Sequence, residues 1–127
     1  MERFRIVAYS SSIRFCITTF IAKENNQVVG FIDYGPYRGE CLDVAGEVYA
    51  IYILKKYYGK GIGYGLIHAA IDEMKAYRQV AVWVLEKNER AIRFYSRIGF
   101  VADGEKQPIN LGTPITEIRM ILKGYYR

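Results

Sequence analysis

The sequence predicts a single α+β domain built around a mixed β-sheet. Its 127 residues suit one hydrophobic core, and a composition with 51% hydrophobic and 24% charged residues is that of a packed globular protein. Short runs rich in β-branched and aromatic residues alternate with two segments of helical periodicity. A strand, helix, strand succession in the middle of the chain indicates a parallel strand pair, whereas an early hairpin indicates antiparallel pairing. We therefore treat residues 1–127 as one domain.

The first half of the sequence predicts a hairpin followed by a third strand. Residues 18–23 and 28–34 are mixed β-branched and aromatic runs, and residues 24–27 (ENNQ) between them have the composition of a turn. Residues 47–54 (EVYAIYIL) have strong β propensity and predict the third strand. The serine run at residues 10–12 has no histidine and aspartate pattern around it, so we interpret it as a loop or turn.

The middle of the sequence predicts a helix that leads into a buried strand. From residue 62 to residue 77, apolar side chains recur at helical spacing, while Asp72 and Lys75 fall off that face. Residues 80–85 (VAVWVL) are continuously apolar, as expected of a central strand covered on both faces. Because this strand follows a helix, we expect its partner strand to be parallel.

The last third of the sequence predicts a second helix and two more strands. Asn88 is placed to cap the helix and Gly99 to end it, with apolar side chains on one side between them. Residues 100–102 and 116–122 predict the two strands, and turn residues that include Asp103-Gly104 separate them.

Composition narrows the classes of function. There are 18 Lys and Arg residues against 13 Asp and Glu, and the net charge of +5 suits an anionic partner such as a phosphorylated cofactor, a nucleic acid or an acidic lipid. No apolar stretch reaches the roughly 18 residues that a membrane span needs, and the start of the chain shows no secretory signal, so we expect a cytoplasmic protein. Cys16, Cys41 and His68 are too few and too far apart for a zinc site, so no metal is expected. Both cysteines are expected to be small buried residues.

A glycine-rich turn from a strand into a helix occupies residues 55–66 (KKYYGKGIGYGL). Glycines let successive backbone N–H groups converge, and a helix N-terminus adds partial positive charge, so this turn is suited to a phosphate group. The dinucleotide pattern G-x-G-x-x-G fails from both Gly59 and Gly61, and a Walker loop fails because neither Ser nor Thr follows Lys60. The alternative is a tight turn that needs glycine for steric reasons alone.

A second informative stretch covers residues 88–100 (NERAIRFYSRIGF). Asn88 and Tyr95 are seven residues apart, about two helical turns, so both side chains can face one ligand. Taken alone, this pattern favours ordinary core packing of Tyr95 with a satisfied hydroxyl group.

Together, the two stretches resemble the GNAT family of acyl-coenzyme A dependent N-acyltransferases. The family's loop pattern Q/R-x-x-G-x-G/A stands here as residues 56–61, with Lys56 in the first position. Its later pattern N-x-x-A-x-x-F/L-Y-x-x-x-G-F is matched at each named position from Asn88 to Phe100. The resemblance covers roughly residues 28–122. It implies a mixed, mostly antiparallel sheet with a splayed central pair of parallel strands, flanked by helices.

The resemblance also implies acetyl-coenzyme A as co-substrate and a primary amine as acceptor. Backbone amides of residues 59–63 would hold the pyrophosphate, and the free edge of the third strand would pair with the pantetheine arm. Tyr95 would protonate the departing thiolate, Asn88 would hold the cofactor or an ordered water, and Glu47 would be the base. The cofactor-binding residues implied in this way are Ile51, Tyr52, Ile53, Lys56, Gly59, Lys60, Gly61, Ile62, Gly63, Asn88, Ala91 and Tyr95.

Glu47 has two interpretations from the residues alone. An isolated acid at the start of an otherwise apolar strand is either an exposed strand end or a functional group. An amine arrives protonated at neutral pH and must lose a proton before it attacks a thioester, so a base is needed. A carboxylate of ordinary pKa serves in that role through water, or with its pKa raised by burial.

The sequence departs from the family at its N-terminus. Members place a strand and two helices before the hairpin, and those helices wall the acceptor site, but only 17 residues precede Thr18 here. Either residues 1–9 form the first strand with the helices deleted, or the chain is a shortened member. We expect an acetyltransferase that acts by direct attack, with a coenzyme A-binding module of little or no turnover as the alternative. A basic nucleic-acid-binding domain is disfavoured because the basic residues are spread along the chain, and a homodimer would complete an open site.

Overall fold

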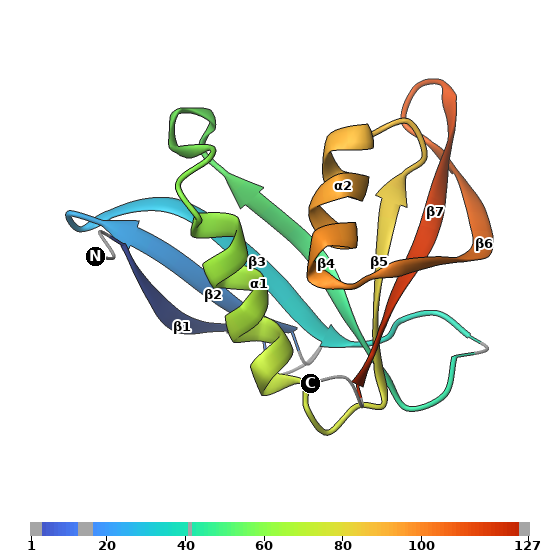
Figure 1. Ribbon diagram of the computed structural model, residues 1–127, viewed down its shortest axis with the longest axis horizontal. Helices are drawn as coiled ribbons and strands as arrows, with labels where there is room; N and C mark the ends of the chain where they lie inside the picture. Colours follow the sequence, from blue (N-terminus) through green and yellow to red (C-terminus); the bar gives the residue numbers. More distant parts are fainter. Residues whose placement is uncertain (1–3, 13–16, 41, 125–127) are drawn as a thin grey trace.

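The computed structural model describes residues 4–12, 17–40 and 42–124, which form one mixed seven-stranded sheet with two α-helices (Figure 1). The sheet order is β1-β2-β3-β4-β5-β7-β6, and β4 and β5 are its parallel pair. The predicted mixed, mostly antiparallel sheet is therefore confirmed. The strands are β1 (Arg5–Ser12), β2 (Ile17–Glu24), β3 (Gln27–Pro36), β4 (Ala45–Ile53), β5 (Gln79–Leu85), β6 (Val101–Asn110) and β7 (Pro114–Lys123), and the helices are α1 (Ile62–Glu73) and α2 (Glu89–Ile98).

The hairpin of β2 and β3 forms as predicted. The two strands pair antiparallel down to Glu24 and Gln27, and the turn between them holds Asn25 and Asn26 at φ values of 51° and 64°. Two successive positive φ values are typical of the hairpin turn whose twist matches that of the flanking strands, and asparagine tolerates this conformation well. The turn thus fixes the register next to it, and an extra residue of β3, Val29, shifts the register of the rest of the hairpin.

The serine run at residues 10–12 lies in β1, so its prediction as a loop or turn was wrong. In the antiparallel ladder Ser10 pairs with Thr18, and this long-range pairing outweighs the local turn preference of serine. Residues 13–16 join β1 to β2 and are too few for two helices, so the first strand is present without the helix pair that the family resemblance implies between these strands. Cys16 and Cys41 lie outside the described residues.

The central strand β4 is where the sheet opens. Its parallel pairing with β5 ends at the Val48–Val82 pair. On its other edge, two consecutive residues of β3 face Val48 and Ala50, so Tyr49 is the extra residue of a β-bulge. A bulge bends the strand that carries it, and this one directly follows the last residue paired with β5. The predicted splay is thus present, and the bulge gives its local cause.

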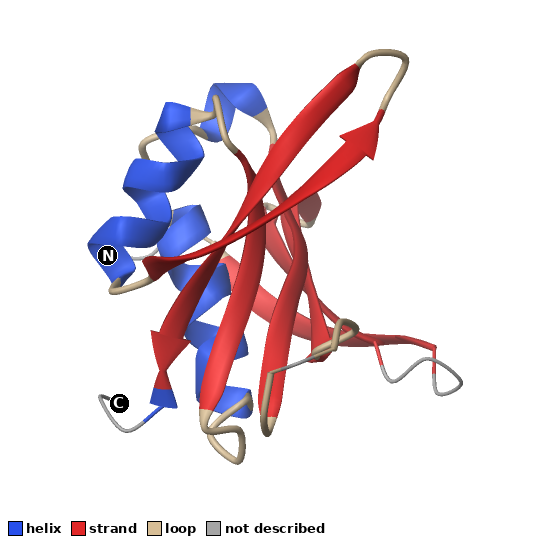
Figure 2. Cartoon of the chain, turned by 90° about the vertical axis from the view of Figure 1, so that its right-hand side faces the viewer, coloured by secondary structure: helices blue, strands red, loops and turns tan. Residues whose placement is uncertain are grey.

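Both α-helices lie on the same side of the sheet (Figure 2). The core between the helices and the sheet contains Val48 of β4, Val82 of β5 and Met120 of β7. Because side chains alternate along a strand, the neighbouring residues point to the opposite face. No helix within the described ranges is both long and apolar enough to cross a membrane.

Two predicted boundaries differ from the structure. Helix α1 ends at Glu73 rather than at residue 77, and the Tyr77 N–H donates to the Met74 carbonyl in a turn. Met74 and Tyr77 still belong to the core and its flank, so the apolar spacing continues past the end of the helix. Strand β6 is also much longer than residues 100–102.

The Asp103-Gly104 pair, predicted as a turn, forms an irregularity inside β6 instead. Pairing with β7 shifts between Ala102 and Lys106, and Gly104 has a φ of +92°. Glycine at a positive φ is a common bulge residue, so one sequence signal suits both a turn and a bulge. Beyond the bulge β6 is polar and mostly exposed, so it lacks the alternation by which the sequence marks a half-buried strand.

Candidate functional site

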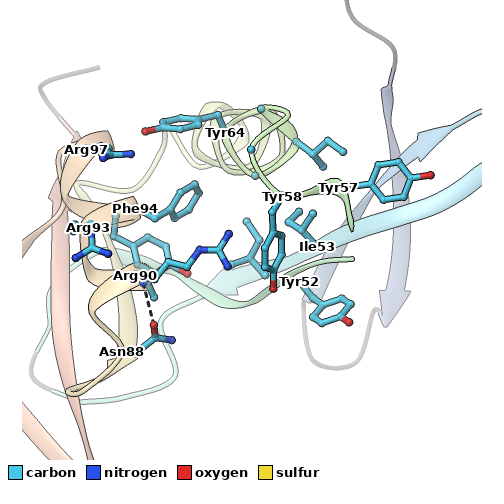
Figure 3. Close-up of a pocket in the computed structure, with 17 residues that line it drawn as sticks. Tyr52, Ile53, Tyr57, Tyr58, Tyr64, Asn88, Arg90, Arg93, Phe94 and Arg97 are labelled. Carbon is cyan, nitrogen blue, oxygen red and sulfur yellow. Dashed lines mark hydrogen bonds between the residues drawn. The ribbon is translucent and has the colours of Figure 1, made fainter. Parts of the chain in front are cut away.

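Two cavities flank the point where β4 leaves β5. The larger has a volume of about 740 Å³ and lies between β4, the glycine-rich turn, the start of α1 and the face of α2 (Figure 3). The smaller has a volume of about 270 Å³, and its walls include Glu47, Trp83 and Glu117. These three residues alternate with Val48, Val82 and Ile118 of the helix-side core and its flank, so the smaller cavity opens on the opposite face of the sheet.

The backbone of β4 forms one wall of the larger cavity. The Leu54 N–H donates to the Val29 carbonyl of β3 at 2.9 Å. Because N–H and C=O directions alternate along a strand, the backbone groups of Ile53 and Ile51 point the other way, toward the side that β5 has left. This edge can bond an extended ligand as another strand would. The predicted residues Ile51, Tyr52 and Ile53 all line the cavity.

The glycine-rich turn closes one end of the larger cavity. Gly59 and Gly61 have φ values of +78° and +82°, and a Cβ added to either would have no heavy atom within 4 Å. Gly61 is also the N-cap of α1, with no side-chain cap and no acid in the first turn. The first amides of the helix therefore have neither an intrahelical partner nor a capping side chain, which suits an anion. Gly59, Gly61, Ile62 and Gly63 line the cavity.

The two predicted lysines are not among the lining residues. The ammonium groups of Lys56 and Lys60 lie 5.4 and 5.3 Å from the centroid of the Tyr57 ring, and Tyr57 itself lines the cavity. Both lysines thus place positive charge beside a residue that lines the cavity, without lining it themselves. Their role in cofactor binding remains a prediction.

Helix α2 supplies the wall that faces the glycine-rich turn. The Asn88 Oδ1 accepts a hydrogen bond from the Ala91 N–H at 3.1 Å and caps the helix (Figure 3). This cap confirms the predicted helix start, and it gives Asn88 a structural role beside the predicted ligand contact. Asn88, Ala91 and Tyr95 all line the cavity, as their spacing along one helix face predicts.

Tyr95 is the titratable group buried most deeply in this cavity wall. It is 6% exposed and packs edge-to-face against Phe94 and Phe100, with ring centroids 5.2 and 5.5 Å away. Burial raises the pKa of Tyr95 to about 12. The phenol therefore stays protonated throughout the neutral range, as a proton donor must.

Three arginines of α2 also line the larger cavity, and the sequence reasoning missed them. Arg90, Arg93 and Arg97 follow one another at helical spacing, which is a signal that the sequence carried. The Arg90 guanidinium lies 3.7 Å from the centroid of the Tyr58 ring and so reaches across to the glycine-rich turn (Figure 3). The cavity thus has a cationic wall opposite the helix N-terminus.

The smaller cavity is built around Glu47. This residue is 3% exposed, so it is not the exposed strand end that the sequence left open. Its carboxylate accepts a hydrogen bond from the Arg38 backbone N–H at 3.0 Å and pairs with the Arg38 guanidinium at 3.3 Å. Arg38 also lies over the Tyr49 ring, 4.0 Å from its centroid. The role of Glu47 as a base remains a prediction.

A second ion pair stands behind the smaller cavity. Arg119 of β7 is 8% exposed, pairs with Asp103 at 2.7 Å and donates to the Tyr37 hydroxyl oxygen at 3.1 Å. Burial would raise the pKa of Asp103, but the hydrogen bonds and charge of Arg119 outweigh that effect and lower it. Arg119 thereby fixes the ring of Tyr37, the residue that directly precedes Arg38 in the chain. No local pattern connects residues so far apart in sequence, so sequence reasoning missed this network.

The structure does not bring Glu47 and Tyr95 into one cavity. Tyr95 lines the larger cavity and Glu47 the smaller, on opposite faces of the sheet. The pairing of β4 with β5 ends at Val48, and β4 lines the smaller cavity up to the bulge and the larger cavity beyond it.

Comparison with known proteins gives a consistent result. A sequence model described as the Acetyltransferase (GNAT) family matches residues 4–100. An uncharacterized N-acetyltransferase of Mycobacterium bovis is 32% identical over 104 residues, which cover 80% of this chain and 63% of that protein. The chain thus spans less than two thirds of the length of this relative.

Solved structures show the same fold. An N-acetyltransferase from Staphylococcus aureus Mu50 superposes with a TM-score of 0.72 at 26% identity, covering 87% of this chain and 69% of the other. The structure of yncA from Salmonella typhimurium, solved with its cofactor acetyl-CoA, superposes with a TM-score of 0.71 at 22% identity, covering 85% of this chain and 65% of the other.

The burial of Tyr95 predicts a defined alkaline destabilisation. Between about pH 10, where tyrosine of the unfolded chain ionises, and about pH 12, where folded Tyr95 does, only the folded state keeps this proton. The free energy of unfolding therefore falls as pH rises through this window, by on the order of 2 to 3 kcal/mol from this group. Tyr95→Phe should remove that part of the loss in urea unfolding curves measured from pH 8 to 11. Parallel losses in the variant and the unmodified protein would contradict the assignment.

Proposed function

The chain belongs to the GNAT family of acetyltransferases, and from this premise we propose that it transfers an acetyl group from acetyl-CoA to a primary amine. One observation carries the proposal. The edge of β4 that β5 leaves lies between a helix N-terminus without a side-chain cap on one face and a buried carboxylate on the other. Such an arrangement suits an extended, phosphorylated thioester whose reacting end sits in the gap.

The larger cavity supports a defined arrangement of the co-substrate. The first amides of α1, beside Gly59 and Gly61, would hold the pyrophosphate, and the α2 arginines would neutralise the remaining phosphate charge. The backbone of Ile51 and Ile53 would pair with the amide groups of the pantetheine arm. The acetyl-CoA-bound structure that shares this fold supports the choice of ligand.

The proposed chemistry is direct attack without a covalent enzyme intermediate. An acceptor amine loses a proton to Glu47, directly or through a water molecule, and its nitrogen then forms a bond to the thioester carbonyl carbon. The carbon–sulfur bond breaks, the departing thiolate takes a proton from Tyr95, and the nitrogen releases its second proton as the amide forms, which balances, through water, the proton that Tyr95 gave up. The raised pKa of Tyr95 keeps this proton in place until the thiolate forms.

A coenzyme A-binding module with little or no turnover is the second candidate. It is favoured by the connection at residues 13–16, which leaves no room for the helix pair that would wall the acceptor site. A second copy of the chain that completes the site, and a cytoplasmic location, likewise remain predictions.

The first prediction for this function concerns the glycine-rich turn. Coenzyme A at about 100 times its dissociation constant should stabilise the fold by about 2.7 kcal/mol. Gly61→Val should abolish this stabilisation, because a branched side chain blocks backbone approach and strains a positive φ. Thermal-shift titration measures the effect.

Gly104→Val is the matched control for this prediction. Gly104 also has a positive φ and no heavy atom within 4 Å of an added Cβ, but it lies in β6, away from the cavity. This variant should be destabilised and still respond to coenzyme A. An equal response in folded Gly61→Val protein would remove the phosphate assignment.

Tyr95→Phe tests the proposed acid. The variant should keep its affinity for coenzyme A and lose roughly 10² to 10⁴ in turnover, the usual contribution of general acid catalysis. Thiol release measured against an amine panel gives the rate, and Tyr34→Phe, another buried tyrosine outside both cavities, is the control. Undiminished turnover in Tyr95→Phe would exclude the phenol as the acid.

Glu47→Gln tests the proposed base through the pH profile of turnover. The loss should be greatest near neutral pH and partly recovered at high pH, where more of the amine is already deprotonated. A uniform loss across the pH range would instead indicate that Glu47 only holds the shape of the smaller cavity. Tyr95→Phe should not show this recovery.

A further inference from the structure

Arg38 occupies the acidic end of the smaller cavity. Its guanidinium lies 3.3 Å from the Glu47 carboxylate and 4.0 Å from the centroid of the Tyr49 ring. The Arg38 side chain is 61% exposed, whereas that of Glu47 is 4% exposed. A cation held mostly in water therefore covers a carboxylate held almost entirely in protein.

The guanidinium is the exchangeable partner in this contact. The Glu47 carboxylate also accepts a hydrogen bond from the backbone N–H of Arg38, a bond that any residue except proline at this position preserves. Water competes for the exposed guanidinium, whereas the buried carboxylate still needs a cation beside it, which an incoming ammonium group can supply. The side chain of Arg38 can thus leave while Glu47 keeps its position.

The space that Arg38 fills suits a small organic cation. Glu47 and Glu117 supply negative charge, and the rings of Tyr49 and Trp83 supply aromatic faces. An ammonium group binds favourably between a carboxylate and an aromatic face. Arg119, the other cation near this cavity, is paired with Asp103 and hydrogen-bonded to Tyr37.

We propose that the Arg38 side chain occupies the binding site for the acceptor's ammonium group, between Glu47 and Tyr49. A cationic amine then binds by displacing the Arg38 guanidinium. The inference rests on the proposed function, because it assigns the site that binds the acceptor's ammonium group in that reaction. It makes Arg38 a specificity-determining residue whose charge opposes acceptor binding. Removing that charge should therefore tighten the binding of a cationic amine.

Trp83 allows this binding to be measured without turnover. It is the single tryptophan of the sequence and lines the smaller cavity. Its emission is followed during titration with butylamine, which is protonated at pH 7, in the absence of acetyl-CoA. Arg38→Met, which keeps the length of the side chain and loses the charge, should bind butylamine roughly three- to thirtyfold more tightly, the range set by one exposed ion pair and one cation–π contact.

Three controls separate charge from shape. Arg38→Lys retains a competing cation and should bind more weakly than Arg38→Met. Arg78→Met removes another exposed arginine, paired with Asp43 at 3.3 Å and outside both cavities, and should bind like the unmodified protein. The neutral isostere 1-butanol should gain no affinity in Arg38→Met.

The outcomes distinguish this inference from the proposed function. Equal or weaker butylamine binding in Arg38→Met, or no saturable response in either protein, overturns the proposed ammonium site even where acetyl transfer is observed. Tighter butylamine binding in Arg38→Met supports the proposed ammonium site. It does so even if the protein transfers no acetyl group, in which case the proposed function alone fails.

Discussion

The site depends on one backbone irregularity, the bulge at Tyr49 in β4. Before the bulge, β4 is paired on both edges, through β3 and β5. After it, β4 stays paired with β3 alone, because the extra residue bends the strand away from β5. The bulge also shifts the alternation of side chains, so that Val48 and then Ile51 both face the helix side. The extra residue thus frees one edge of β4 where β4 separates from β5. Its own side chain is the Tyr49 ring that lies beside Arg38.

Two arginine–carboxylate pairs near the smaller cavity differ in how exposed the arginine is to solvent, and this difference gives the two pairs different roles. Arg119 and Asp103 are 10% and 27% exposed in their side chains and meet at 2.7 Å, so separating them would leave a charge without a partner in a poorly hydrated place. Arg38 and Glu47 meet at 3.3 Å with the cation 61% exposed and the carboxylate 4% exposed, so the cation can return to water, while the carboxylate keeps the Arg38 backbone N–H and favours another cation in its place. The Arg119–Asp103 pair therefore holds the structure beside the smaller cavity in place, whereas the Arg38 guanidinium can be exchanged for another cation.

Sequence reasoning succeeded where the chemistry is local. The glycine-rich turn, the Asn88 cap and the spacing of Ala91 and Tyr95 all lie within short segments whose geometry follows from the helix period. It failed where neighbours come together only through strand pairing. Trp83 and Glu117 line one cavity from two paired strands, and the length of β6 depends on its pairing with β7. The α2 arginines were an omission of another kind, since their helical spacing was visible.

The division of the site between two faces has a consequence for how acceptor choice is encoded. The glycine-rich turn, α1 and α2 line the larger cavity, whereas sheet side chains and the loop through Arg38 line the smaller one. With only residues 13–16 between β1 and β2, helices inserted there are not available to shape the second face. On the proposed function, acceptor specificity would then reside in residues such as Glu47 and Trp83, whose backbone is fixed by the sheet, and in the exposed Arg38. On the same proposal, substitutions at Arg38 would alter acceptor preference while the larger cavity stays intact.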